Sequence, residues 1–171
     1  MFRVLEGLTE AQDRRMVISK IIEVPQMDVT ALLAGIPVMS LSPKVQSSLL
    51  SAVFEFARIF SVRQVQAAID QILGLETLPE ITMYLLLKVD DFYPQMNEYF
   101  LNNALPSLIS KRVWESSTLF RGFIRIIEKK LPKSLKVIDM LPVECQEILK
   151  QKDSVKKAMM EASIRRGAFN A

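Results

Sequence analysis

Apolar residues recur every three or four positions along most of the chain, which is the spacing of one face of an α-helix. One stripe runs from Val45 through Leu49, Val53 and Phe56 to Phe60. A second stripe consists of Leu119, Phe120, Phe123, Ile124, Ile126 and Ile127. Strand signals are almost missing, because no Asn-Gly or Asp-Gly turn separates two alternating runs. The pattern predicts an all-α protein.

Polar caps, prolines and glycines divide this pattern into separate helices. Ser42-Pro43 combines an N-cap with a proline suited to the first helical turn, and Ser61–Gln64 has the spacing of a capping box. Gly35 is expected to end the helix that precedes it. Pro106 is expected to kink or split its helix, since proline has no N–H and clashes with the preceding turn.

These signals add up to about nine or ten helices joined by short loops, and short loops favour antiparallel neighbours. The predicted fold is therefore all-α, with irregular stacked helix pairs like those of a HEAT-like α-solenoid; a compact bundle is the alternative. We expect a single helical domain over residues 1–166 and a tail over 167–171. Residues 2–7 resemble the end of a helix whose start is missing, which predicts that the chain is a fragment of a longer protein.

Composition excludes several classes of protein. The 171 residues are 50% hydrophobic and 24% charged, which is too apolar for a disordered chain. The longest stretch without a charged residue, 29–43, contains glycine and proline and is too short to span a membrane. No basic and apolar leader opens the chain, so a secretory signal is not expected.

The chain also lacks the residues on which much enzyme chemistry depends. It has no histidine, the commonest general acid–base group and metal ligand, and its one cysteine, Cys145, has no histidine to activate it. Glycine-rich phosphate loops and nucleophile elbows are missing as well. We therefore expect a binding module with no catalytic residues, no metal and no cofactor.

Charge is unevenly distributed along the sequence. Residues 1–110 contain eight basic and twelve acidic residues, whereas residues 111–171 contain fourteen and seven, so the two parts have net charges of −4 and +7. An acidic partner is accordingly expected at the second part. The candidate contacts, called here the predicted basic set, are Lys111, Arg112, Arg121, Arg125, Lys129, Lys133 and Lys136.

Arg121, Arg125 and Lys129 lie four residues apart and so share one face of a helix. This face is interpreted either as ordinary solvated surface or as a docking surface for an acidic protein or for RNA phosphates. Specific RNA binding has little support, because it needs exposed aromatic residues, whereas Phe123 has core-facing spacing. Trp114 is either an interface anchor or a core residue at a helix junction.

Several motifs resemble the C-terminal region of the symplekin family. The opening of the chain is similar to the start of that region, and the similarity is most specific over about residues 93–150. The motifs that carry it are Leu5-Glu6-Gly7-Leu8, Val24-Pro25, Tyr93-Pro94, the run from Ile109 to Trp114, Gly122-Phe123-Ile124, the run from Pro132 to Ile138, and Leu141-Pro142.

The resemblance implies a non-enzymatic scaffold module of pre-mRNA 3′-end processing in the nucleus. It implies binding to the C-terminal regions of the metallo-β-lactamase-type endonuclease subunit of the cleavage and polyadenylation factor and of its inactive paralogue. The predicted basic set would supply electrostatic contacts, and Trp114 and Phe123 would support them from the core. The alternative is an RNA-binding helical-repeat module that uses the basic second part, although RNA binding is expected to be at most weak and non-specific. No membrane and no small-molecule substrate are expected as partners.

Overall fold

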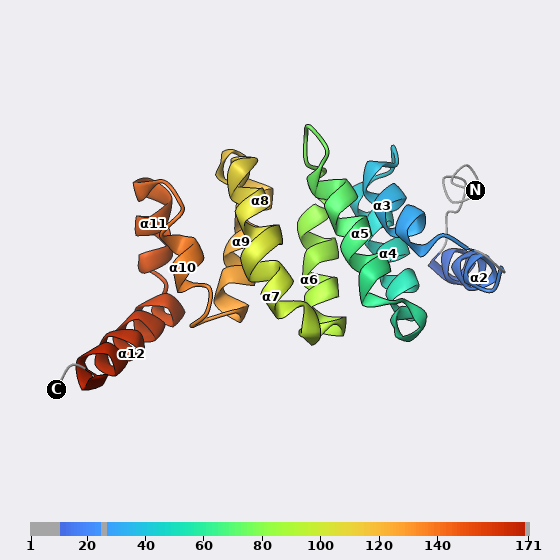
Figure 1. Ribbon diagram of the computed structural model, residues 1–171. Helices are drawn as coiled ribbons and strands as arrows, with labels where there is room; N and C mark the ends of the chain where they lie inside the picture. The colour runs from blue at the N-terminus through green and yellow to red at the C-terminus, as the bar shows by residue number, and fades with distance from the viewer. Residues whose placement is uncertain (1–10, 25–26, 170–171) are drawn as a thin grey trace. The chain divides into compact units, whose positions relative to one another are not determined.

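The computed structural model describes residues 11–24 and 27–169, with side chains over 15–24 and 27–164. Across these residues the chain forms helices and turns and contains no strand, so the all-α prediction is confirmed (Figure 1). Packing groups the chain into two compact units, residues 1–96 and 97–171. Packed helix pairs occur in both, as the stacked-pair prediction requires.

The first unit contains α2 (Ala11–Ile22), α3 (Val29–Val38), α4 (Pro43–Phe54), the 3-10 turn η1 (Ala57–Ile59), α5 (Val62–Leu73), α6 (Thr82–Phe92) and the 3-10 turn η2 (Pro94–Met96). Helix α3 packs on α5 and α2 packs on α4, while α4 also contacts α3 and α6. The buried side chains at the centre of this unit include Leu32, Leu33, Ile36, Leu49, Leu50, Val53, Ile69 and Ile72.

Two predicted helix starts are present as local hydrogen bonds. The Ser42 hydroxyl accepts from the Val45 N–H at 3.4 Å at the start of α4. At the start of α5 the Ser61 hydroxyl accepts from the Gln64 N–H at 3.2 Å, and the Gln64 side chain accepts from the Ser61 N–H at 3.0 Å. The predicted capping box is therefore confirmed.

The expectation that Gly35 ends its helix is wrong. Helix α3 continues to Val38, because Ile36 and Pro37 extend its buried face. Gln46 on α4 supplies donors for the carbonyls at this end: its buried Nε2 lies 3.2, 3.1 and 3.0 Å from the carbonyl oxygens of Ile36, Pro37 and Met39. These contacts outweigh the cost of a helical glycine, which is about 1 kcal/mol.

The second unit contains α7 (Asn97–Tyr99), the π-helix η3 (Phe100–Ala104), α8 (Leu105–Ser110), the 3-10 turn η4 (Val113–Glu115), α9 (Ser117–Lys129), α10 (Leu135–Ile138), α11 (Val143–Lys150) and α12 (Asp153–Phe169). Helix α12 extends into the residues that were expected to form a tail and packs on α10 and α11. The buried side chains of this unit include Phe100, Leu105, Leu108, Phe123, Ile126, Ile127, Leu149 and Val155.

Pro106 divides its helix by a change of hydrogen bonding. From Asn97 to Ser110 the chain stays helical. The π-helical segment η3 ends at Ala104, directly before α8, and Pro106 is the second residue of α8. The N–H of Leu105 bonds to the Phe100 carbonyl, five residues earlier. A π segment shifts the donor pattern by one residue, which suits a position where proline supplies no N–H.

Candidate functional site

Helix α9 presents a basic face because its apolar residues are held inward. Its N-cap is Ser116, whose hydroxyl accepts from the Leu119 N–H at 3.3 Å. Leu119, Phe123, Ile126 and Ile127 are buried along one side of the helix. The opposite side therefore exposes Arg121, Arg125 and Lys129, which are named the α9 stripe.

The two arginines of the α9 stripe have no balancing group within the part of the chain that the structure describes. Neither Arg121 nor Arg125 makes a hydrogen bond or an ion pair there. Four other basic residues of the second unit each have a carboxylate partner, in the pairs Arg112–Glu115, Lys133–Glu98, Lys150–Glu147 and Lys156–Asp153. Within the α9 stripe, Arg121 and Arg125 are thus uncompensated positive charges among the described residues.

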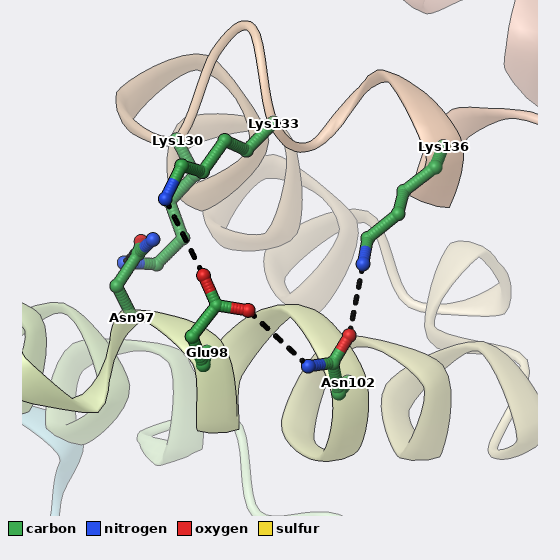
Figure 2. A network of polar contacts seen from close by, with 6 residues as sticks. All are labelled: Asn97, Glu98, Asn102, Lys130, Lys133 and Lys136. Atoms are coloured by element: carbon green, nitrogen blue, oxygen red, sulfur yellow. Dashed lines mark hydrogen bonds and ion pairs between the residues drawn. The ribbon is translucent and has the colours of Figure 1, made fainter.

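Lys133 and Lys136 are directed elsewhere, toward the helical run that starts at Asn97 (Figure 2). The Lys133 ammonium lies 3.3 Å from a Glu98 carboxylate oxygen, and the Lys136 ammonium donates to the Asn102 side-chain oxygen at 2.9 Å. Asn102 donates in turn to Glu98 at 3.4 Å. The structure therefore does not bring these two lysines together with the α9 stripe, because α9 ends at Lys129 and a turn separates it from α10.

Sequence analysis missed Lys130, which is only 7% exposed. Its ammonium lies 4.6 Å from the centre of the Phe100 ring and donates to the Asn97 side-chain oxygen at 3.1 Å. A signal for this burial exists in the sequence: Lys130 is four residues after Ile126 and three after Ile127, so it continues the apolar face of α9. Lys130, Lys133 and Lys136 are named the inner lysines.

The remaining residues of the predicted basic set lie where α8 ends. Lys111 is half-buried, and Arg112 is exposed with a backbone φ of 52°, the left-handed conformation that commonly ends a helix. The turn η4 that follows packs on α9. Trp114 within η4 is half-buried, whereas Phe123 of α9 is fully buried and stacks at 6.3 Å on Phe120. Phe123 therefore lies on the buried side of the basic helix.

The comparison with known families connects this surface to a protein class. The family model described as "Symplekin tight junction protein C terminal" matches residues 10–152. This range includes most of the chain, all of α9 and the inner lysines.

The chain belongs to the symplekin C-terminal family. Symplekin is a scaffold of the polyadenylation machinery, and the family domain has no known catalysis. The predicted resemblance is therefore confirmed. No solved structure matches the chain.

A further surface of this symplekin-family chain is apolar. Large exposed apolar side chains follow α10, lie on α11 and lie on α12; they are Met140, Val143, Ile148, Met159, Met160 and Ile164. Helix α12 starts just after the range that the symplekin family model matches. Methionine is flexible and polarisable and adapts to differently shaped partners, so these side chains suit protein contacts.

The one cysteine of this symplekin-family chain is not activated as a nucleophile. Cys145 is buried. The pKa of its thiol is raised mainly by this burial and to a smaller extent by the neighbouring Glu144 carboxylate. This favours the protonated thiol over the reactive thiolate. Among the described residues, no three histidine, cysteine or acidic side chains are grouped to hold a metal, and no helix is long and apolar enough to cross a membrane.

Proposed function

We propose that this chain is the part of a symplekin scaffold that holds two nuclear partners. The partners are the C-terminal regions of the metallo-β-lactamase-type endonuclease subunit of the cleavage and polyadenylation factor and of its inactive paralogue. The family match over residues 10–152 is the observation that carries this proposal. The chain contributes no catalysis, and zinc chemistry belongs to the partner.

The second unit has the surface properties that such binding requires. The α9 stripe attracts acidic groups and accelerates association, while exposed apolar side chains of α11 and α12 supply area that a partner covers. Phe123 holds α9 in place from the core, and half-buried Trp114 supports it from η4. Lys111 and Arg112, where α8 ends, are assigned weaker contacts.

The direct test is co-purification of the chain with each partner region separately and with both together. We expect both regions to be retained in equal molar amounts at near-physiological salt. A correctly folded chain that retains neither region contradicts the proposal. Retention of a single-stranded RNA oligonucleotide with sequence preference, in the absence of either region, favours the RNA-binding alternative instead.

A further inference from the structure

The exposed positions of α9 are occupied by cations and small hydroxyl residues. They are Ser117, Thr118, Arg121, Arg125 and Lys129. The one acidic residue of the helix, Glu128, is half-buried, and its carboxylate accepts from the Ser154 hydroxyl at 2.7 Å. The outward face of α9 thus carries charge of a single sign over about 12 Å of helix.

This arrangement has an energetic cost for the isolated chain. Like charges four residues apart on a helix repel each other and destabilise it. Arg112, Lys133, Lys150 and Lys156 of the second unit are each paired with a carboxylate at 3.1 to 3.8 Å. Arg121 and Arg125 have no such compensation within the described residues, so an anion from outside the chain would relieve the repulsion.

We propose that the α9 stripe receives an acidic helical segment of the partner, with carboxylates one helical turn apart. Four residues of an α-helix span about 6 Å, so glutamates four residues apart on a neighbouring helix match the spacing of Arg121 and Arg125. Each guanidinium has two parallel donors that pair with a carboxylate in a fixed geometry. The inference rests on the proposed function, since it specifies the chemistry of that partner's docking segment.

A protein carboxylate fits this surface better than RNA phosphate does. Proteins that bind single-stranded RNA stack its bases on exposed aromatic rings. Beside the α9 stripe, Phe123 is fully buried and Phe120 is half-buried against it. No aromatic residue occurs among the large exposed apolar side chains of residues 97–164. The inner lysines are occupied by Asn97, Glu98 and Asn102, so they do not extend the stripe.

The test compares the full chain with two double variants of equal charge change. Arg121→Glu/Arg125→Glu reverses the stripe, and Lys152→Glu/Lys157→Glu reverses two exposed lysines outside it. The probes are a synthetic helical peptide with glutamate at every fourth position, a peptide of the same composition with its glutamates in one block, and a single-stranded RNA oligonucleotide. Binding is measured by fluorescence anisotropy at low salt and at near-physiological salt.

We expect the peptide with glutamate at every fourth position (the spaced peptide) to bind better than the peptide with its glutamates in one block. Arg121→Glu/Arg125→Glu should lower the affinity for the spaced peptide about tenfold, whereas Lys152→Glu/Lys157→Glu should change it by less than about twofold. Equal losses in both variants would overturn the inference, since they indicate a response to net charge alone. Equal affinity for the two peptides, or stripe-dependent RNA binding tighter than peptide binding, would overturn it too. Circular dichroism of the wild type and the two double variants is the control that all three proteins are equally folded.

Co-purification with the endonuclease and paralogue regions separates this inference from the proposed function. If wild type and the stripe variant retain both regions equally, the proposed function stands and the α9 stripe is not the docking surface. If wild type retains neither region but binds the spaced peptide through Arg121 and Arg125, the stripe recognises acidic helices and its partner is a different protein.

Discussion

At the scale of single residues, neighbouring lysines of similar sequence context have different roles. Lys130 is buried beside Phe100, whereas Lys133 is exposed and pairs with Glu98. We expect Lys130→Ala to lower the free energy of unfolding by about 2 kcal/mol, because it removes a desolvated cation–π contact and the packing of the lysine stem. Lys133→Ala, the matched control, should cost less than about 1 kcal/mol, since exposed ion pairs contribute little. Urea unfolding measures both, and equal effects would contradict the assignment.

Tyr93 links stability to alkaline pH. Its hydroxyl is buried and donates to the Ala57 carbonyl at 2.6 Å, and burial raises its pKa above the ordinary value. Because the pKa is raised in the folded state, the buried neutral hydroxyl of Tyr93 contributes fully to stability below about pH 10. This contribution is lost as the pH rises further. Tyr93→Phe should lower the free energy of unfolding by about 1 kcal/mol at pH 7, because the buried Ala57 carbonyl loses one of its two donors and keeps only the Phe60 N–H. The stability of this variant should also decline less at alkaline pH. Urea unfolding from pH 7 to 11 checks this; Cys145, whose pKa is raised in the same direction, is present in both proteins. An unchanged alkaline decline in Tyr93→Phe would show that Tyr93 is not its source.

The sequence predicts the outward residues of the α9 stripe better than the inner lysines. Arg121 and Arg125 follow from periodicity alone, because one amphipathic helix determines which side is exposed. The contacts of Lys133 and Lys136 join residues separated by 35 and 34 positions, so they depend on tertiary packing that local spacing does not encode. Residue type alone would place Lys130 on the surface, but this charged side chain occupies a position that continues the apolar face of α9.

At the scale of helices, local caps were predictable and helix ends were less so. The Ser61–Gln64 capping box involves only adjacent turns, and it formed as expected. The end of α3 depends instead on Gln46, a side chain from the next helix that approaches three carbonyl oxygens. Glycine propensity at Gly35 was therefore overridden by a tertiary contact, which is the usual reason that such predictions fail.

This view of α3 gives a test at the same scale. Gln46→Leu keeps approximately the size of the side chain but removes the donor to the Ile36, Pro37 and Met39 carbonyls. The Ile36 and Met39 carbonyls keep backbone donors, the N–H groups of Met39 and Leu41, but the buried Pro37 carbonyl is left without one. The substitution should therefore lower the free energy of unfolding by about 1–3 kcal/mol. Gln71→Leu makes the same chemical change at an exposed position of α5 and should change stability by less than about 0.5 kcal/mol. Chemical denaturation of the two variants compares them, and a stable Gln46→Leu protein would show that this contact is dispensable.

At the scale of the whole molecule, the chain contains two compact units, each with its own buried centre. Sequence composition and length predicted one domain over residues 1–166, and neither indicates a boundary near Met96. In helical-repeat proteins, two compact units can still behave as one domain, because each helix pair is a local unit and neighbouring pairs stabilise one another. The single-domain prediction is therefore a statement that the two units unfold together in one cooperative transition. A measurement of unfolding in solution decides this.

The distribution of fluorophores makes that measurement direct. Trp114 is the sole tryptophan of the sequence and lies in the second unit, so its fluorescence reports that unit, whereas far-ultraviolet circular dichroism reports helices of both. If the chain is one domain, the two signals should change with the same midpoint and slope during urea unfolding, as a two-state transition requires. Trp114→Phe, followed by dichroism, controls for any effect of the probe. A fluorescence transition displaced from the dichroism transition would show instead that the unit containing Trp114 unfolds independently of the other.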